Sequence, residues 1–81
     1  MQNCYLCDIL PGQKCTVRKL LTQGEMRRRL LDMGLVPETI VECVGKSPLG
    51  DPKAYLIRGA VIAIRSSDTK NILISPCGVT R

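Results

Sequence analysis

Two cysteines near the N-terminus have a spacing that metal sites use. Cys4 and Cys7 form a C-x-x-C pair, which lets two thiolates reach one tetrahedral ion. The chain has no histidine, so further ligands would come from Cys77, from Asp8 or from another chain. Because the termini of small domains often lie near each other, Cys4, Cys7 and Cys77 could converge on Zn or Fe(II). The alternative is that Cys4 and Cys7 are ordinary thiols of the tail and of a helix start.

Three consecutive arginines, Arg27, Arg28 and Arg29, could form either a phosphate-binding patch or the solvated face of a helix. Arg28 and Arg29 each have an acidic residue four positions away, Asp32 and Glu25, which is within side-chain reach on a helix. Arg27 has no acidic neighbour at that spacing. The chain has no phosphate-binding glycine motif, and its only aromatic residues are two tyrosines. These observations favour a solvated helix face over a nucleic-acid contact.

Composition limits the class of protein. A chain of 81 residues forms one small domain, and its 44% apolar content supports a packed core. No segment approaches the ~20 apolar residues that cross a bilayer, and the N-terminus does not resemble a signal peptide. The five cysteines are an odd number, which favours reduced thiols and a cytoplasmic location. The net charge of +5 suits nucleic acid, an anionic membrane surface or an acidic protein, and does not choose among them.

Short strands separated by proline and glycine must position these side chains. The segment 13–20 alternates like a strand, with Cys15 and Val17 on one face and Thr16 and Arg18 on the other. Segments 38–45, 53–59, 60–66 and 70–75 are rich in β-branched residues and are also expected to be strands. A tight hairpin turn is expected at Arg58 and Gly59. So many short strands in a small chain predict a small β-barrel, closed or partly open.

One helix is expected after the first strand. Thr22 precedes Glu25 by three residues, which is the spacing of a capping box. Gly34 permits a left-handed helix end, so the predicted helix runs from Gln23 to Gly34. Its expected core-facing stripe consists of Met26, Leu30 and Met33.

Five segments, in order and at these intervals, resemble the FeoA family: LPGQ, RRLLDMGLVP, SPLGDP, IAIR and NILI. The resemblance covers about Leu6 to Ile74. It implies a mainly β fold, a small SH3-like β-barrel with an inserted α-helix and a short N-terminal helix. We expect a single such domain over residues 1–81, with tails at 1–5 and 75–81. Two residues depart from the family pattern: Glu38 stands where Gly is common, and Thr69 stands where Ala is usual.

The resemblance implies an accessory protein and not an enzyme, so no catalytic residues and no required cofactor are expected. FeoA proteins are thought to act with FeoB, a ferrous iron permease whose cytoplasmic part hydrolyses GTP. We therefore expect a cytoplasmic regulator that binds an FeoB-type permease through its G-domain region. Leu49, in a proline-flanked loop, either anchors in a partner pocket or folds back over the barrel mouth. The expected partner-binding residues are Ser47, Pro48, Leu49, Gly50, Asp51, Pro52, Arg27 and Arg58.

Two other functions stay open from the sequence. The first is a metal sensor or delivery module that binds Zn or Fe(II) through Cys4 and Cys7. The second is a small nucleic-acid-binding barrel, which the basic balance allows and the scarcity of aromatic residues disfavours. An anionic membrane surface and a second copy of the chain are further candidate partners.

Overall fold

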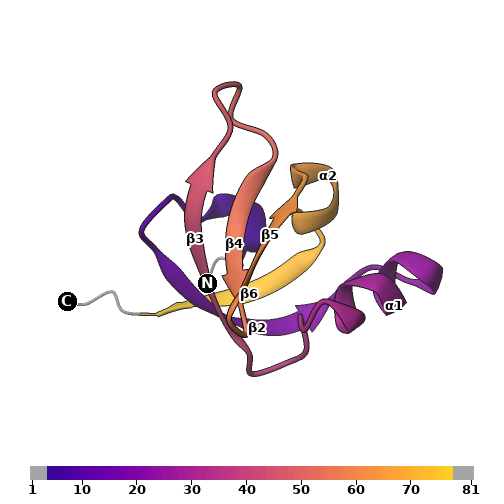
Figure 1. Cartoon of the computed structure of the whole chain (residues 1–81). Coiled ribbons are helices and arrows are strands. Elements are labelled where there is room, and N and C mark those ends of the chain that lie inside the picture. The colour runs from indigo at the N-terminus through magenta and orange to yellow at the C-terminus, as the bar shows by residue number, and fades with distance from the viewer. Residues whose placement is uncertain (1–3, 78–81) are drawn as a thin grey trace.

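A computed structural model describes residues 4–77, and the side chains as far as Ser75. The fold consists of six strands and three short helical segments (Figure 1). The strands are β1 (Cys4–Tyr5), β2 (Lys14–Leu20), β3 (Ile40–Lys46), β4 (Lys53–Ile57), β5 (Ala60–Ile64) and β6 (Ile72–Cys77). The helical segments are the 3-10 helix η1 (Leu6–Asp8), α1 (Gly24–Asp32) and α2 (Ser66–Thr69). The predicted mainly β class and the short N-terminal helix are confirmed.

The strands form one antiparallel sheet in the order β1-β6-β2-β3-β4-β5. The sheet curls so that β6 crosses beneath β4 and β5 in Figure 1. Within residues 4–77 the order is linear, with β1 and β5 at its two edges. Strand pairing therefore leaves the sheet open, so of the two forms that the sequence allowed, a closed barrel is not formed by the described strands.

The core lies inside the curl of the sheet and is almost entirely aliphatic, as the composition requires. Cys15 and Val17 of β2 are fully buried, which confirms the predicted strand face. Tyr55 is the one aromatic side chain in the described core. The buried apolar residues are Leu6, Ile9, Cys15, Val17, Leu20, Leu30, Leu35, Val41, Cys43, Tyr55, Ile57, Ile64, Ile72 and Ile74.

A β-bulge interrupts β2. Val17 pairs with Ile74 and Lys19 pairs with Leu73, so Arg18 is an extra residue without an opposite partner. Strict alternation would turn one of two consecutive side chains inward. The bulge leaves both Arg18 and Lys19 exposed, and the next residue, Leu20, is buried again. Two cations are thereby presented side by side at the end of β2.

The predicted hairpin turn is confirmed. Ile57 pairs with Ala60, and the two residues between them, Arg58 and Gly59, have φ of 50° and 88°. Positive φ at both central residues is the mark of a type I′ turn, whose twist matches that of the strands it joins.

The start of α1 differs from the prediction. The capping residue is Gln23, without a side-chain hydrogen bond, and the buried hydroxyl of Thr22 has no hydrogen-bond partner. The expected capping box between Thr22 and Glu25 is therefore not formed. Gly24 adopts a φ of 69°, so the chain turns in the left-handed region as it enters the helix. The cap position is thus Gln23, one residue later than Thr22, so the Thr22–Glu25 spacing no longer matches that of a capping box.

The end of α1 agrees with the prediction. Gly34 has a φ of 102°, and its amide donates to the carbonyl of Leu31 at 2.9 Å. The Leu35 amide donates to the carbonyl of Leu30 at 3.1 Å. These two bonds define a Schellman motif, and the buried Leu30 and Leu35 supply its apolar contact.

The two faces of α1 are as expected, but the ion pairs are not. Leu30 is buried, and Met26 and Met33 pack against the core as half-buried residues. On the other face, the described side chains of Arg28 and Arg29 form no ion pair with the acidic residues four positions away. All four side chains are exposed, so α1 has a solvated charged face.

The predicted tails are partly strand. Cys4 pairs with Ile74, and β6 continues its pairing with β2 as far as Cys77, opposite Lys14. Residues 4–5 and 75–77 therefore belong to the sheet, because backbone hydrogen bonding continues past the last apolar position. Residues 1–3 and 78–81 lie outside the described part of the chain.

The short helix α2 was not predicted. Its N-terminus is capped by Asp51, whose Oδ1 accepts a hydrogen bond from the Ser66 amide at 2.7 Å. Thr69, which departs from the family pattern, is fully buried, and its hydroxyl donates back to the Arg65 carbonyl at 3.4 Å. A threonine is therefore accommodated here by a hydrogen bond within the turn. None of the helices between residues 4 and 77 has the length and apolar character to span a bilayer.

Candidate functional site

The loop Ser47–Pro52, here called the Leu49 loop, joins β3 to β4 and projects from the sheet at the top of Figure 1. Leu49 at its tip is 93% exposed. The side chain therefore does not fold back over the sheet, so of the two alternatives that the sequence left open, the contact with a partner is the one that stays a prediction. A leucine this exposed loses the hydrophobic stabilisation that burial would give it, so it is available to a partner.

The backbone of the Leu49 loop is held by four hydrogen bonds. The Ser47 amide donates to the Pro52 carbonyl at 3.1 Å, and the Gly50 amide donates to the Ser47 carbonyl at 2.8 Å. The Ser47 hydroxyl donates to the Asp51 carbonyl at 2.8 Å. The fourth bond is the Asp51 cap on α2. Ser47 and Asp51 were predicted to contact a partner, and the structure shows both supporting the shape of the loop.

Lys53 anchors the base of the same loop to the N-terminal segment. Its Nζ donates to the carbonyl of Cys7 at 2.8 Å and to the carbonyl of Ile9 at 2.9 Å. Bonds from a charged donor are stronger than neutral ones. The loop is thus fixed at β4 as well as at α2.

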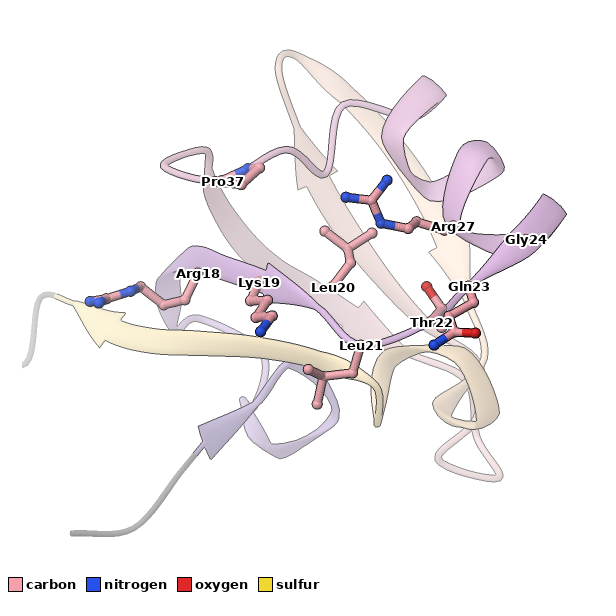
Figure 2. Close-up of a pocket in the computed structure, with 9 residues that line it drawn as sticks. All are labelled: Arg18, Lys19, Leu20, Leu21, Thr22, Gln23, Gly24, Arg27 and Pro37. Atoms are coloured by element: carbon pink, nitrogen blue, oxygen red, sulfur yellow. The ribbon is translucent and has the colours of Figure 1, made fainter.

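A groove of about 510 Å³ lies between the end of β2 and the start of α1 (Figure 2). We call it the cationic groove. Figure 2 shows Arg27 extending from α1 over Leu20. Arg18 and Lys19 are the two residues of β2 that precede Leu20. The lining residues are Arg18, Lys19, Leu20, Leu21, Thr22, Gln23, Gly24, Arg27 and Pro37.

The lining of the cationic groove has one sign of charge. Arg18, Lys19 and Arg27 contribute three cations, and no lining residue is acidic. Leu20, Leu21 and Pro37 add apolar surface between them. A concave surface lined by one sign of charge concentrates the potential and attracts ligands of opposite charge. The sequence predicted Arg27 as an uncompensated cation. It did not predict that Arg18 and Lys19 would both be exposed beside it, because that exposure depends on the bulge in β2.

The predicted partner-binding residues do not form one site. Arg27 belongs to the cationic groove, whereas Arg58 lies in the β4–β5 turn, where its side chain packs against Gly34. The Leu49 loop follows β3, and Pro37 of the groove precedes it. At about 3.3 Å per residue, β3 separates these two places by about 20 Å.

The predicted metal ligands are only partly described. Among the side chains between residues 4 and 75, no group of three potential ligands could hold a metal ion. The Cys7 Sγ lies 3.8 Å from Oδ1 of Asp8. Burial and the Asp8 carboxylate raise the pKa of Cys7, which disfavours the thiolate that a metal needs. The described residues therefore do not fit a metal centre.

The third predicted ligand, Cys77, has its backbone in β6 and its side chain outside the described residues. Metal binding at Cys4, Cys7 and Cys77 stays a prediction, which metal analysis of reduced, anaerobic protein tests. Cys15 and Cys43 were expected to be core residues, and both are fully buried.

A small antiparallel β domain with an exposed loop and a shallow charged groove is typical of a binding module. The family model of the FeoA domain matches residues 4–76. The chain belongs to the FeoA family, which is associated with ferrous iron transport. A search of curated proteins gave no match.

Solved structures agree with this family assignment. The iron(II) transport protein A of Clostridium thermocellum is similar with a TM-score of 0.89 and 31% identity, over 93% of this chain and 46% of that one. This chain thus spans less than half of that protein. An FeoA-like protein of Clostridium acetobutylicum has a TM-score of 0.89 and 30% identity, over 100% of this chain and 94% of that one.

A third structure supports the fold alone. The FeoA of Stenotrophomonas maltophilia, solved in complex with zinc, has a TM-score of 0.79 and 22% identity, over 89% of each chain. It is described as a prokaryotic SH3 domain protein and as a candidate activating factor of ferrous iron transport. The present fold is therefore SH3-like, in agreement with the resemblance seen in the sequence.

Proposed function

We propose that this protein is a cytoplasmic accessory protein of ferrous iron uptake, without catalytic activity or a required cofactor, that binds an FeoB-type permease. Membership of the FeoA family supports a role in ferrous iron transport. The observation that carries the binding proposal is the exposed Leu49 on a loop held by its own hydrogen bonds. The expected contact on the permease is its cytoplasmic G-domain region.

The loop suits a contact of this kind for two physical reasons. Burying one leucine side chain in a partner pocket contributes roughly 1.5–3 kcal/mol. A loop that is already ordered loses little conformational entropy on binding, so more of that energy becomes affinity. A single protruding leucine is also a specific feature, since it requires a matching pocket.

The test is binding of the purified chain to the cytoplasmic region of the matching permease, measured by calorimetry in nucleotide-free, GDP and GTP-analogue conditions. Leu49→Asp is expected to weaken binding at least about tenfold, because a carboxylate cannot enter an apolar pocket. Leu10→Asp is the matched control, because Leu10 is also an exposed loop leucine, at 54%. It should bind like the unaltered chain.

Three outcomes have clear meanings. Equal weakening in both variants would show that the added charge matters and not the loop. Unchanged binding in Leu49→Asp would keep the partner and remove the loop as the contact. No binding under any nucleotide condition would contradict the proposed function.

A further inference from the structure

We propose that the cationic groove binds an extended acidic segment of a partner protein, with carboxylates against its cations and apolar side chains against its leucines. The inference goes beyond the proposed function, because the groove lies at the opposite end of β3 from the Leu49 loop. A binding site there would be a second contact with its own chemistry.

The charge of the groove carries the first step. Arg18, Lys19 and Arg27 line one concave surface and come from two different elements, β2 and α1. None of the three is neutralised within the described residues, and no acidic side chain lines the groove. Guanidinium groups match carboxylates in geometry and can bind them in bidentate fashion. The spare charge therefore points to an anionic ligand.

The apolar part of the groove carries the second step. Leu20 forms a buried floor, at 7% exposure, and Leu21 beside it remains 45% exposed. Pro37 closes the groove from the other side. A free inorganic anion would gain no binding energy from contact with this apolar surface. A peptide that alternates acidic and apolar residues would use both kinds of surface.

The lining residues also favour a peptide over a nucleic acid as the ligand of the groove. The groove contains no aromatic side chain on which a base could stack. Three cations can neutralise only about three phosphates, which is few compared with most nucleic-acid interfaces. The first-turn amides of α1, which have no side-chain cap, add attraction for an anion of either kind and do not separate the two.

The experiment uses the full chain labelled with ¹⁵N and a capped peptide of sequence ELEELE as the probe. Amide shifts in the heteronuclear spectrum are followed during titration. The expected result is saturable shifts at the β2 end and the α1 start, centred on Lys19, Gln23 and Arg27. Matched probes are the neutral peptide QLQQLQ, inorganic phosphate and a short single-stranded oligonucleotide.

Two charge-reversed variants provide the decisive comparison. Arg27→Glu lies in the groove, whereas Arg28→Glu lies on the solvated face of the same helix and changes the net charge equally. Arg27→Glu should weaken peptide binding at least about tenfold, and Arg28→Glu by less than about threefold. The dispersion of each variant's spectrum reports whether it is folded.

The proposal is overturned if both variants weaken binding equally, because the attraction would then be a property of net charge. It is also overturned if phosphate or the oligonucleotide binds the groove more tightly than ELEELE at the same salt concentration. Failure here leaves the Leu49 loop test unaffected, since that test uses the permease and a different face.

Discussion

Gly34 closes α1 so tightly against Arg58 that a Cβ at position 34 would stand 2.8 Å from Cδ of Arg58. It would also stand 3.2 Å from Cγ2 of Ile57. The Schellman end of the helix is thus fitted to the β4–β5 hairpin. The same glycine serves a backbone role and a packing role, because its φ of 102° is one that residues with side chains rarely adopt.

Gly34→Ala is therefore expected to destabilise the fold by about 2–3 kcal/mol, from backbone strain and from the displaced Arg58 side chain. Chemical denaturation measures this change. In the Arg58→Ala background the cost should fall to about 1–2 kcal/mol, because only the backbone strain and the contact with Ile57 remain. Equal costs in both backgrounds would show that Arg58 moves aside freely.

Glu38 occupies a backbone conformation that suits glycine, with a φ of 78°. The resemblance to the FeoA family implies Gly at this position, and a positive φ is a physical reason for that preference. Glu38→Gly should stabilise the fold by about 0.5–1 kcal/mol, as relief of strain outweighs the greater freedom of glycine in the unfolded chain. Thr39→Gly is the control, because Thr39 does not have a positive φ, and it should destabilise. A loss of stability in Glu38→Gly would contradict the strain argument.

Tyr55 links pH to stability. Burial raises its pKa from 10.0 to about 12, against the opposing effect of a hydrogen bond with Thr69. A raised pKa of the folded state means that the stabilisation is complete below pH 10 and is lost as pH rises towards 12. The free energy of unfolding should fall there by at most about 1.4 kcal/mol per pH unit from this group.

Tyr55→Phe isolates that contribution. The variant should lose about 1 kcal/mol at pH 7, because the Tyr55 hydroxyl donates to the Leu6 carbonyl at 3.5 Å. It should also show a shallower decline between pH 10 and pH 12. An unchanged decline between pH 10 and pH 12 in Tyr55→Phe would contradict this assignment.

Cys7 should be a slow nucleophile. Burial and the neighbouring Asp8 raise its pKa, so the reactive thiolate is scarce at pH 8. In a Cys4→Ser background, alkylation of folded protein by iodoacetamide should be slower at Cys7 than in the unfolded chain. Asp8→Asn should raise the rate, and mass spectrometry follows both. Rapid alkylation of Cys7 in the unaltered protein would contradict this account.

The parts of the fold that the sequence predicted are those governed by neighbouring residues. The turn at Arg58 and Gly59, the helix end at Gly34 and the buried face of Cys15 and Val17 each depend on a few consecutive positions. The capping box failed although its local pattern was complete, because Gly24 redirected the chain. The helix α2, with four residues, is too short to show a period.

The cationic groove could not be predicted because its parts come from distant positions. Pro37 and Arg27 come to it from different parts of the chain, and Arg18 and Lys19 are both exposed in its lining because β2 contains an extra residue. A bulge depends on how β6 pairs with β2, and the sequence of one strand does not contain that information. The exposure of Leu49 was left open by the sequence as well, because flanking prolines predict a rigid loop and not the direction in which its tip side chain points.

Because of the bulge in β2, the charge of the groove depends on the number of residues between Val17 and Leu20. In a regular strand, side chains on one face are spaced by two residues, so charge on that face is limited to one residue in every two. The extra residue at Arg18 doubles that density locally without lengthening the sheet. A chain with one residue fewer between Val17 and Leu20 would keep its core and its strand order, yet would lose one cation from the groove. Spacing as well as residue type would therefore identify the relatives that share this surface.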